Sequence, residues 1–403
     1  MTSRPLHAVL LPPAAAAGRM LEVLSAALDG TGPAILPLDP ALPPAALAAS
    51  IAAFAPAAIE TPAGLERLPA AGASRGAGAA LPPEVAVVIA TSGSTGQPKG
   101  VQLTAAALLA SAHASLHRIG ARPGDRWLCC LPAFHVAGLQ VLVRSLVSGQ
   151  APVVSERLDQ ATLAAAVAQD CQYASLVPTQ LSRLSGAAEL AGFRAILLGG
   201  AAPPAGQLEA ARSAGARVVT TYGMTETCGG CVYDGMPLDG VSVELDEEDR
   251  IRLSGPVLFS GYRFQPELTR QVLRDGWFAT SDLGNLSADG RLTVRGRSDG
   301  VINSGGRKVV PGEVEAALDG CAGVQAVVVV GVPHPEWGEI VTAVVVPSDP
   351  ADPPTLAQLR ARAQLSLPAW AAPHALVLQQ ELPLLRSGKP DREAARLLAA
   401  ADG

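Results

Sequence analysis

The sequence predicts an α/β protein with a large N-terminal layered α/β domain, followed by a smaller α+β C-terminal domain. The chain has 403 residues, more than one ordinary hydrophobic core accommodates, so we expect two domains. Apolar strand-like runs alternate with helical patterns through the middle of the chain, an order typical of a layered α/β domain. Two later apolar runs, Val324–Val332 and Ile340–Val346, fit a pair of strands in a C-terminal unit.

The large domain opens with an Ala/Pro-rich segment, residues 1–84, that carries little pattern beyond two short amphipathic stretches. Gly72–Pro83 indicates a linker into the first clear strand. From there the alternation is regular. We expect strands at Val85–Ala90, Val101–Thr104, Leu128–Leu131, Ala151–Val154, Tyr173–Leu176, Ala195–Leu198 and Arg217–Thr220, and helices at Leu21–Leu28, Ala45–Phe54, Ala105–Ile119, Leu139–Leu146, Ala161–Ala168 and Thr179–Leu184.

The pattern changes after the last of these strands. Val241–Leu253 indicates a hairpin with an acidic turn at Asp246–Asp249. Pro311 suits the first turn of a helix, because its fixed φ is already helical. A further helix is expected at Thr355–Gln364.

Composition excludes several classes of partner. The net charge is −6 with no basic block, so nothing indicates a nucleic-acid or anionic-membrane surface. No apolar run free of charge and proline is long enough to span a membrane. His7–Ala17 resembles the core of a secretory signal, but Pro12 and Pro13 interrupt it, and we expect a cytoplasmic protein.

The six cysteines allow two interpretations. Cys228 and Cys231 have the spacing of half a zinc site, but no second Cys or His pair completes it. The alternative, free buried thiols in a reducing cytoplasm, is the favoured one.

Thr91–Gly100, Thr-Ser-Gly-Ser-Thr-Gly-Gln-Pro-Lys-Gly, is the most informative stretch. Its glycines let backbone N–H groups form a concave nest for anionic oxygens, while its hydroxyls can donate and Lys99 adds a positive charge. It is not a P-loop, because Pro98 rather than glycine precedes Lys99 and Gly100 follows it. Taken alone, the stretch fits a phosphate-binding loop or a solvated hairpin turn.

Two later side chains are candidates for a substrate pocket. His135 lies just past a strand and could hydrogen-bond carboxylate or phosphate oxygen, although a lone histidine is often structural. Arg144 interrupts an otherwise apolar helix. A buried arginine needs a partner, ideally a carboxylate, whereas a surface arginine would simply extend its head group into water.

Two strand ends are candidates for nucleotide contacts. Gly199 and Gly200 would let a flat base lie against bare backbone, or would serve only a tight strand–helix turn. In Thr221–Thr227, Tyr222 can stack on a base, Thr225 can donate to phosphate and Glu226 can hold Mg²⁺, which takes few protein carboxylates. The alternative is that Thr225 and Glu226 only cap a helix.

These strings resemble, in order, the motifs of the adenylate-forming superfamily, which includes acyl-CoA synthetases, aryl-CoA ligases, luciferases and peptide-synthetase adenylation domains. The resemblance covers roughly residues 85–392 and extends to Asp275–Asp282, Arg295–Lys308 and Glu381–Arg392. Two positions depart from the pattern. Ser281 replaces the glycine of Thr-Gly-Asp, and Gly300 stands where an acidic residue is common.

The resemblance implies a site residue by residue. Catalytic roles fall to Lys389, His135 and Lys99, Mg²⁺ ligands to Glu226 and Thr95, and a hinge to Asp299. The hinge divides the chain into residues 1–298 and a mobile domain of residues 299–403 that carries Lys389. The ATP contacts implied are Thr91, Ser92, Gly93, Ser94, Thr95, Gly96, Lys99, Gly199, Gly200, Ala201, Thr221, Tyr222, Gly223, Thr225, Asp282, Arg297 and Lys389. The acyl substrate would meet His135, Arg144, Gly200 and Gly223, and coenzyme A would meet Gly305, Gly306 and Arg307.

The implied reaction has two steps, formation of an acyl-adenylate from ATP and a carboxylic acid, then displacement of AMP by the thiol of coenzyme A. Within the superfamily, Phe134–Gly138 with Arg144 and Ile302–Pro311 look like the o-succinylbenzoate–CoA ligases of menaquinone biosynthesis. That substrate has a second carboxylate, which would give Arg144 a partner.

Other functions remain open at this point. The chain could be another acyl- or aryl-CoA ligase, a stand-alone adenylation enzyme or, more distantly, a non-catalytic nucleotide-binding protein. The presence of both Glu226 and Lys389 argues against the last. The expected partners are ATP, Mg²⁺, coenzyme A and a small carboxylic acid, with a homodimer as a possible assembly.

Overall fold

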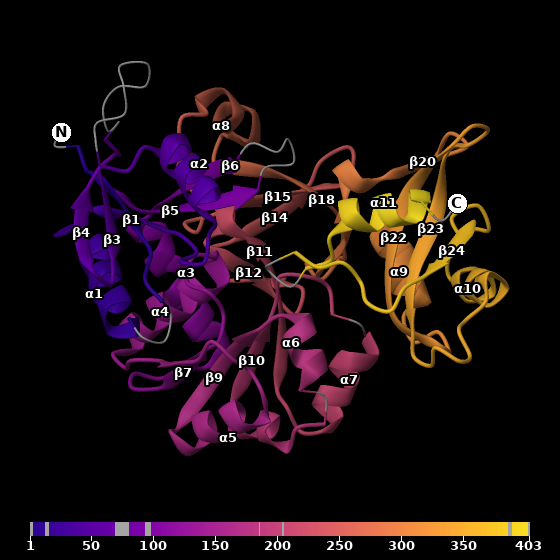
Figure 1. Ribbon diagram of the computed structural model, residues 1–403, viewed down its shortest axis with the longest axis horizontal. Helices are drawn as coiled ribbons and strands as arrows, with labels where there is room; N and C mark the ends of the chain where they lie inside the picture. Colours follow the sequence, from indigo (N-terminus) through magenta and orange to yellow (C-terminus); the bar gives the residue numbers. More distant parts are fainter. Residues whose placement is uncertain are drawn as a thin grey trace.

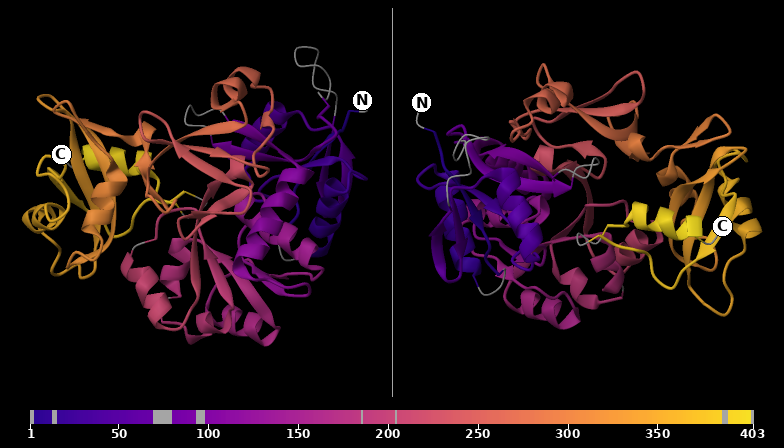
Figure 2. Two further views of the ribbon diagram at one scale, coloured as in Figure 1. Left: turned by 180° about the vertical axis from the view of Figure 1, so that it is seen from behind. Right: turned by 45° about the horizontal axis from the view of Figure 1, so that its top comes forward.

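The computed structural model describes residues 3–12, 16–68, 80–92, 98–184, 186–203, 205–385 and 389–401. It is a mixed α/β fold with a large domain and a smaller domain built by the C-terminal part of the chain (Figure 1). The strands in these ranges form four sheets, three in the large domain and one in the small domain. Two further views show the small domain to one side of the large domain (Figure 2). The predicted α/β class with a large and a small domain is confirmed.

The first sheet contains the N-terminal strands and the hairpin on either side of the predicted phosphate loop. Its order is β16-β6-β5-β2-β1-β3-β4. Neighbours among β1, β2, β3 and β5 pair in parallel, whereas β6 is antiparallel to β5. The bounds are β1 Leu6–Val9, β2 Ala34–Pro37, β3 Ala58–Thr61, β4 Gly64–Arg67, β5 Val85–Ser92, β6 Pro98–Thr104 and β16 Gly261–Tyr262, and the first two helices are α1 Ala17–Leu28 and α2 Pro44–Phe54.

The N-terminal segment is more structured than its sequence predicts. Its two helices were expected, but β1 to β4 were not. The apolar run that resembles a signal core supplies β1, which pairs with β2 on one side and β3 on the other and belongs to the buried core. Most of the predicted linker, residues 72–83, lies outside the described residues.

The second sheet has the order β13-β12-β11-β10-β9-β7-β8. From β8 to β11 all pairs are parallel, and β12 is antiparallel to β11. The strand bounds are β7 Arg126–Cys129, β8 Val153–Val154, β9 Cys171–Leu176, β10 Ala195–Leu198, β11 Val218–Met224, β12 Gly229–Tyr233 and β13 Met236–Pro237. The helices are α3 Ala105–Ile119, α4 Val136–Ser148, α5 Gln160–Ala168, α6 Pro178–Arg183 and α7 Ala205–Ser213.

Helices α3 and α4 form the layer that joins the first two sheets. The largest hydrophobic core includes side chains of both helices together with strands of both sheets. The ends of α3 agree with the prediction because its caps are local. Thr104 Oγ1 accepts a hydrogen bond from the N–H of Ala107 at 3.1 Å, and Gly120 ends the helix in a left-handed conformation. This layering fixes the position of the strand ends that carry the predicted site.

The third sheet connects the large domain to the small one. It contains β14 Ser242–Leu245, β15 Arg250–Ser254, β17 Leu273–Arg274, β18 Trp277–Leu286 and β19 Leu292–Arg297. Strands β14 and β15 form the predicted hairpin with its acidic turn. Helix α8 (Pro266–Val272) precedes β17.

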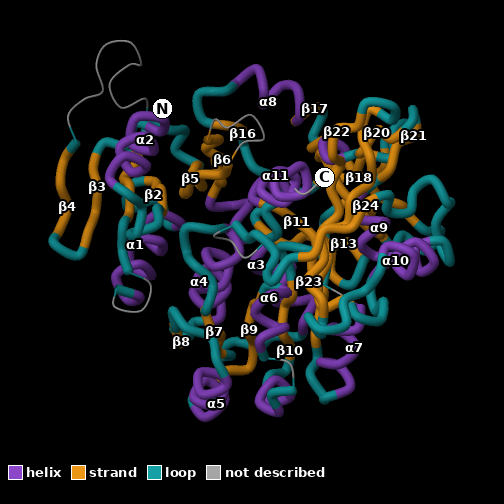
Figure 3. The backbone as a smooth tube through the Cα atoms, turned by 45° about the vertical axis from the view of Figure 1, so that its right-hand side comes forward, coloured by secondary structure: helices purple, strands orange, loops and turns teal. Residues whose placement is uncertain are grey.

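The small domain is built on a hairpin of long strands, β22 and β23. Alternate valines of β22 point to opposite faces: Val329 packs in the core that includes α9 and α10 residues, whereas Val328 and Val330 pack with residues of α11. Figure 3 shows these helices around the sheet. The bounds are β20 Ile302–Ser304, β21 Arg307–Val309, α9 Pro311–Leu318, β22 Val324–His334, β23 Gly338–Pro347, α10 Leu356–Ala363, β24 Ala375–Leu378 and α11 Arg392–Ala401.

Three general features bear on the predictions. None of the helices in the described ranges has both the length and the apolar character needed to cross a membrane. All six cysteines are free and buried. The predicted domain boundary, residues 298 and 299, falls in the short 3₁₀ turn Ser298–Gly300 between β19 and β20, and the boundary itself stays a prediction.

Candidate active site

Side-chain contacts and electrostatic interactions link charged and polar residues where the three sheets of the large domain meet the C-terminal segment. The first sheet contributes a lysine, the end of β11 a tyrosine and a glutamate, the third sheet an aspartate and an arginine, and the C-terminal segment a second lysine. We call these residues the junction cluster: Lys99, Tyr222, Glu226, Asp282, Arg297 and Lys389. All six are residues that the sequence predicts to bind ATP or Mg²⁺.

The predicted phosphate loop is described only at its two ends. Thr91 pairs with Lys99, and Ser92 with Pro98, across the β5–β6 hairpin. Residues 93–97, which include the predicted contacts Gly93, Ser94, Thr95 and Gly96, lie outside the described residues. The ammonium of Lys99 lies 5.3 Å from the centre of the Tyr262 ring.

The segment after β10 and the end of β11 hold the next group. Strand β11 runs four residues beyond its predicted end at Thr220, so Thr221, Tyr222 and Gly223 are strand residues. The 3₁₀ turn Thr225–Thr227 follows it. Its cap is Thr227, whose Oγ1 accepts from the N–H of Met224 at 2.9 Å, so the alternative that Thr225 and Glu226 only cap a helix is wrong.

Two glycines of this region are required by close approach, and a third by its backbone conformation. A Cβ on Gly199 would lie 2.3 Å from Oγ1 of Thr221, and a Cβ on Gly223 would lie 2.0 Å from the carbonyl oxygen of Gly229. Gly200 has φ +90°, a left-handed value, and is followed by Ala201. The bare backbone that was predicted to accept a base is therefore also needed for packing of the strand ends.

Asp282 lies at the centre of a hydrogen-bonded group. Tyr222 donates its hydroxyl proton to Oδ2 of Asp282 at 2.8 Å, and Nη1 of Arg297 lies 3.6 Å from Oδ1. Burial raises the pKa of the Asp282 carboxyl, while the tyrosine and the arginine act in the opposite direction. Arg297 also donates through Nε to Asp299 at 2.8 Å, which links the cluster to the predicted hinge. Ser281 accepts a hydrogen bond from Ser298 through its backbone oxygen at 3.0 Å, so its side chain is not what holds this turn.

Lys389 brings the C-terminal segment to this group. A Cβ placed on Gly200 would lie 3.6 Å from Cε of Lys389, so the lysine stem passes directly over the turn after β10. The side chain keeps contact with solvent, but the surrounding protein atoms and Arg297 lower its pKa, while Asp282 and Glu226 act to raise it. Lys389 is exposed, and no hydrogen bond or ion pair of its ammonium is found among the described residues, so its catalytic role stays a prediction.

His135 is the N-cap residue of α4 and is half-buried, with its ring 4.8 Å from that of Phe134. Burial lowers the pKa of the imidazole, and the positive charge of Lys389 lowers it further. His135 therefore lies near the lysine and favours the neutral form. This arrangement fits the predicted pocket role of His135 but does not test it.

Arg144 lies inside the large domain, 6% exposed, so the alternative of a surface arginine is wrong. Its guanidinium stacks 4.3 Å from the ring centre of Trp127, and Nη2 donates to Oγ of Ser175 at 3.0 Å. Its Nε has no hydrogen-bond partner among the described groups. Burial lowers the pKa of the guanidinium. A buried cation with a spare donor is suited to an anionic group that enters from outside.

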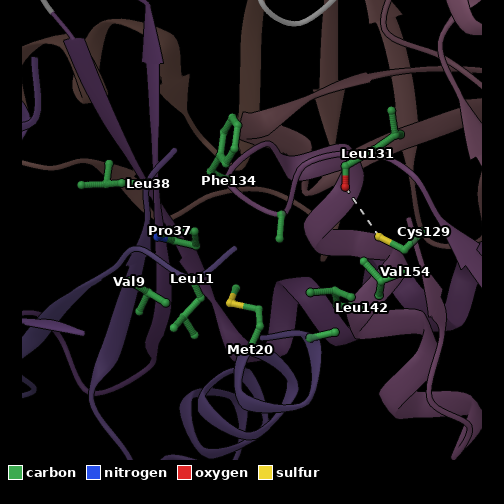
Figure 4. Close-up of a pocket in the computed structure, with 12 residues that line it drawn as sticks. Val9, Leu11, Met20, Pro37, Leu38, Cys129, Leu131, Phe134, Leu142 and Val154 are labelled. Carbon is green, nitrogen blue, oxygen red and sulfur yellow. Dashed lines mark hydrogen bonds between the residues drawn. The ribbon is translucent and has the colours of Figure 1, made fainter. Parts of the chain in front are cut away.

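An apolar cavity of about 30 Å³ lies between α1 and α4 (Figure 4). It is enclosed by side chains of the first sheet, α1, β7 and α4, including Leu11, Met20, Leu38, Phe134 and Leu142. Neither His135 nor Arg144 lines it, so it does not coincide with the predicted acyl site.

The predicted coenzyme A residues lie in the small domain. Gly305 and Gly306 form the β20–β21 turn with φ values of +58° and +76°. The ring of Trp337 covers Gly305, whose N–H donates to the Trp337 carbonyl at 2.8 Å, and Arg307 lies over Trp370. In Figure 1, β20 lies in the outer part of the small domain, away from the end of β11. The structure therefore does not bring these residues to the junction cluster.

Sequence reasoning missed Tyr262, which contacts two predicted site residues at once. It donates its hydroxyl proton to Oε1 of Glu226 at 2.8 Å and lies under the Lys99 ammonium. Its partners are distant along the chain, and Gly261–Tyr262 carries no charge or metal-ligand spacing. The pairing of β16 with β6 in the folded chain brings Tyr262 close to Lys99, and the sequence does not indicate this pairing.

The fold and the junction cluster define an adenylate-forming enzyme of two domains. Comparison with known proteins agrees: residues 66–261 match the AMP-binding enzyme family, and residues 313–389 match the AMP-binding enzyme C-terminal domain. The chain belongs to the AMP-binding enzyme family, and the superfamily resemblance seen in the sequence is confirmed.

Two relatives of this chain carry the same name. The chain is 45% identical over 323 residues to a probable 2-succinylbenzoate–CoA ligase of Mycobacterium tuberculosis, covering 77% of this chain and 84% of the relative. It is 33% identical over 330 residues to the 2-succinylbenzoate–CoA ligase of Bacillus licheniformis, covering 76% and 68%. Among solved structures, it superimposes on o-succinylbenzoate CoA synthetase from Bacillus subtilis in complex with the acyl-adenylate intermediate, with a TM-score of 0.82, 25% identity, and coverage of 98% and 89%.

Proposed function

We propose that this chain is an ATP-dependent acid–CoA ligase that converts o-succinylbenzoate to o-succinylbenzoyl-CoA through an acyl-adenylate. The observation that carries the reaction type is the position of Lys389 over Gly200, among Asp282, Glu226 and Arg297 of the large domain. The choice of acid is supported by the names of the relatives and by the bound intermediate in the Bacillus subtilis structure. A place in menaquinone biosynthesis, which the sequence resemblance implies, is part of the same proposal.

In the first half-reaction a carboxylate oxygen attacks the α-phosphorus of ATP, a new O–P bond forms, and pyrophosphate leaves. The difficulty is that two anions must meet. In this proposal, Lys389 offsets the negative charge on the carboxylate and the α-phosphate. Lys99 offsets the negative charge on the phosphates that leave. His135, held neutral, can donate one hydrogen bond to the acid without adding charge.

Glu226 fits a role in holding Mg²⁺. One carboxylate oxygen, Oε1, is engaged by Tyr262, and no hydrogen bond to Oε2 is found within the described ranges. Those ranges hold no cluster of three or more acidic, His or Cys ligands, which suits an ion that takes one or two carboxylates plus phosphate oxygens and water. When bound, Mg²⁺ would neutralise phosphate charge. Thr95, the other predicted ligand, lies outside the described residues.

The remaining nucleotide contacts are also part of the proposal. The Asp282 carboxylate and Arg297 are placed for the two ribose hydroxyls, as acceptor and donor. Tyr222, fixed by its bond to Asp282, and the backbone of Gly199–Ala201 offer surfaces for the base. Thr221, Thr225 and the first part of the loop, Thr91 and Ser92, remain predicted phosphate-side contacts.

In the second half-reaction the thiol of coenzyme A attacks the acyl carbonyl, a C–S bond forms, and AMP leaves. Gly305, Gly306 and Arg307 must approach the acyl group for this step, but they lie in the outer part of the small domain. We therefore infer that the small domain rotates about Asp299, withdrawing Lys389 and presenting the β20–β21 turn. A homodimer and a cytoplasmic location stay predictions from the sequence.

Arg144 is the residue we propose for the second carboxylate of o-succinylbenzoate. Its spare Nε donor is the supporting observation. Removing a hydrogen bond to a charged group costs about 1.5–3 kcal/mol, so Arg144→Ala should raise the KM for o-succinylbenzoate roughly ten- to hundredfold. The KM for ATP should not change. An unchanged KM for o-succinylbenzoate would show that Arg144 only packs against Trp127.

The proposed function is tested by mass spectrometry of the product. Purified protein incubated with ATP, Mg²⁺, coenzyme A and o-succinylbenzoate should yield o-succinylbenzoyl-CoA, AMP and pyrophosphate. A panel of other carboxylic acids distinguishes the alternatives. Thioester from another acid indicates a different CoA ligase, pyrophosphate without thioester indicates a stand-alone adenylation enzyme, and no ATP consumption with any acid contradicts the proposal.

A further inference from the structure

Tyr262 lies between two groups of opposite charge in the junction cluster. Its hydroxyl donates to Oε1 of Glu226 at 2.8 Å, and its ring centre lies 5.3 Å from Nζ of Lys99. No ion pair joins Lys99 to Glu226 within the described ranges of the chain. Lys99 and Glu226 therefore both contact the same side chain, that of Tyr262, which is 5% exposed.

The backbone around Tyr262 is attached to the same two segments. The N–H of Phe259 donates to the Glu226 carbonyl at 2.8 Å, and the N–H of Arg263 donates to the Gly100 carbonyl at 2.8 Å. Between them, β16 pairs with β6, the strand that carries Lys99. The N–H of Tyr262 donates to Oγ1 of Thr269 at 2.8 Å, which anchors the strand to α8. The tyrosine is thus fixed in position from both sides.

Two physical effects act through this side chain. A hydrogen bond to a carboxylate is short and strong, so the hydroxyl restricts the rotation of Glu226 and leaves Oε2 available. The ring face attracts the ammonium of Lys99. Without the ring, Lys99 and Glu226 would be drawn into a direct ion pair, which would occupy both groups.

We propose that Tyr262 is a positioning residue for the magnesium complex of ATP: its hydroxyl fixes the carboxylate of Glu226 for the metal, and its ring keeps Lys99 separate from Glu226 until the phosphates arrive. This inference rests on the proposed function, because it assumes that the site binds ATP with Mg²⁺. It assigns separate effects to the hydroxyl and the ring of the tyrosine, so the hydroxyl can be removed alone and then together with the ring.

The test measures binding without turnover. ATP is held constant, the acid is omitted, and the rise in Tm is followed as Mg²⁺ is added. Tyr262→Phe keeps the ring and loses the hydroxyl, so the Mg²⁺ concentration at half-maximal effect should rise about tenfold, while the Tm shift given by ATP without Mg²⁺ stays unchanged. Tyr262→Leu also removes the ring and should reduce the Tm shift given by ATP even without Mg²⁺.

Tyr173→Phe is the matched control. Tyr173 is also buried and its hydroxyl is influenced by the charged Arg194, but it lies in β9, which contributes no residue to the junction cluster. This variant should lower the Tm of the unliganded protein without moving the Mg²⁺ midpoint. In a Glu226→Gln background, Tyr262→Phe should produce no further change, because the carboxylate it positions is already lost.

The outcomes separate this inference from the proposed function. If the wild type shows Mg²⁺-dependent ATP binding and Tyr262→Phe has the same midpoint, the positioning role is overturned and the function stands. If the wild type shows no such binding, both are overturned. Should Tyr262→Phe not fold, Glu226→Asp carries the test, because a shorter side chain breaks the same hydrogen bond from the other partner. A wild-type midpoint in Glu226→Asp would equally overturn the role.

Discussion

At the scale of single residues, the pKa of Lys389 reflects opposing effects of the groups around it. Burial and Arg297 weaken its hold on the proton, whereas Asp282 and Glu226 strengthen it, and the net effect is a lowered pKa. The neighbouring carboxylates thus offset the charge of the lysine only in part. Arrival of a triphosphate and a carboxylate supplies the negative charge that it lacks, which favours binding of both substrates in the arrangement seen here.

The lowered pKa of Lys389 predicts a pH dependence for the first half-reaction. Adenylation needs the ammonium form, so pyrophosphate release at saturating ATP should fall on the alkaline side, beginning below pH 10.5, the ordinary lysine value. Lys389→Ala should be roughly a hundred- to a thousandfold slower and should lose this alkaline limb. The measurement is the initial rate of pyrophosphate release from neutral pH upward.

The contribution of Lys389 to stability should rise with pH, whereas the adenylation rate should fall. The opposite directions distinguish loss of the catalytic proton from unfolding. Between the lowered pKa and 10.5, the unfolded chain binds a proton on this lysine that the folded chain has lost. The contribution of Lys389 to the free energy of unfolding therefore increases with pH across this window. A rate that falls together with the Tm would point to unfolding and contradict the assigned role.

At the scale of elements, α4 places His135 through a close backbone contact with the segment that joins β7 to the helix. A Cβ on Gly138, in the first turn of α4, would lie 2.2 Å from the carbonyl oxygen of Pro132 and 2.4 Å from that of Leu131. Both neighbours are backbone atoms that cannot rotate away. The helix can start where it does only because this position lacks a side chain, and its start fixes the imidazole at the N-cap.

Gly138→Ala should therefore displace the start of α4. We expect a loss of stability of about 1–3 kcal/mol from overpacking, seen as a lower Tm, and a slower adenylation rate because His135 moves. Gly206→Ala in α7 is the matched control. It is also a helical glycine, no atom lies within 4 Å of its added Cβ, and its φ is not left-handed, so the same change should leave the Tm equal or higher. Equal Tm values for the two variants would contradict this account of α4.

The elements differ in how well the sequence predicts them, for physical reasons. Strands such as β10 are buried on both faces and give continuous apolar runs that end at glycine, so their bounds were predicted. Strands β1 to β3 have only four residues each in a segment rich in alanine and proline, where apolar runs have little contrast with their surroundings. The charged site residues lie in local motifs. The burial of Arg144 and the bond of Tyr262 to Glu226 depend on packing between distant segments, which no local pattern encodes.

At the scale of the whole molecule, the two domains meet in a small number of polar contacts. Arg295 of β19 donates to Glu313 of α9 at 2.6 Å, and Gly312 approaches the Arg295 carbonyl so closely that a Cβ would lie 2.4 Å from it. Arg297 of the large domain also pairs with Asp299 across the predicted boundary. Contacts of this kind are weaker than an apolar interface and can be exchanged for others. They fit a small domain that takes more than one position relative to the large domain.

The predicted hinge can be tested by fixing its backbone. Asp299 lies in the 3₁₀ turn Ser298–Gly300, and proline holds φ near −65°, within the range of such a turn. Asp299→Pro should therefore favour the arrangement described here, with Lys389 over Gly200. Adenylation, measured by pyrophosphate release in a single turnover, should keep most of its rate. Formation of thioester from added acyl-adenylate and coenzyme A should fall by at least tenfold, because the β20–β21 turn cannot approach.

Asp299→Asn separates the backbone effect from the loss of charge. It removes the ion pair with Arg297 but leaves φ free, so both half-reactions should stay within a few-fold of the wild type, as expected for an exposed pair. Loss of thioester formation in Asp299→Asn as well would assign the effect to the Arg297–Asp299 contact. Normal thioester formation in Asp299→Pro would mean that the small domain does not turn at residue 299, and the rotation would have to be sought in the Val301 segment or the contacts of Arg295.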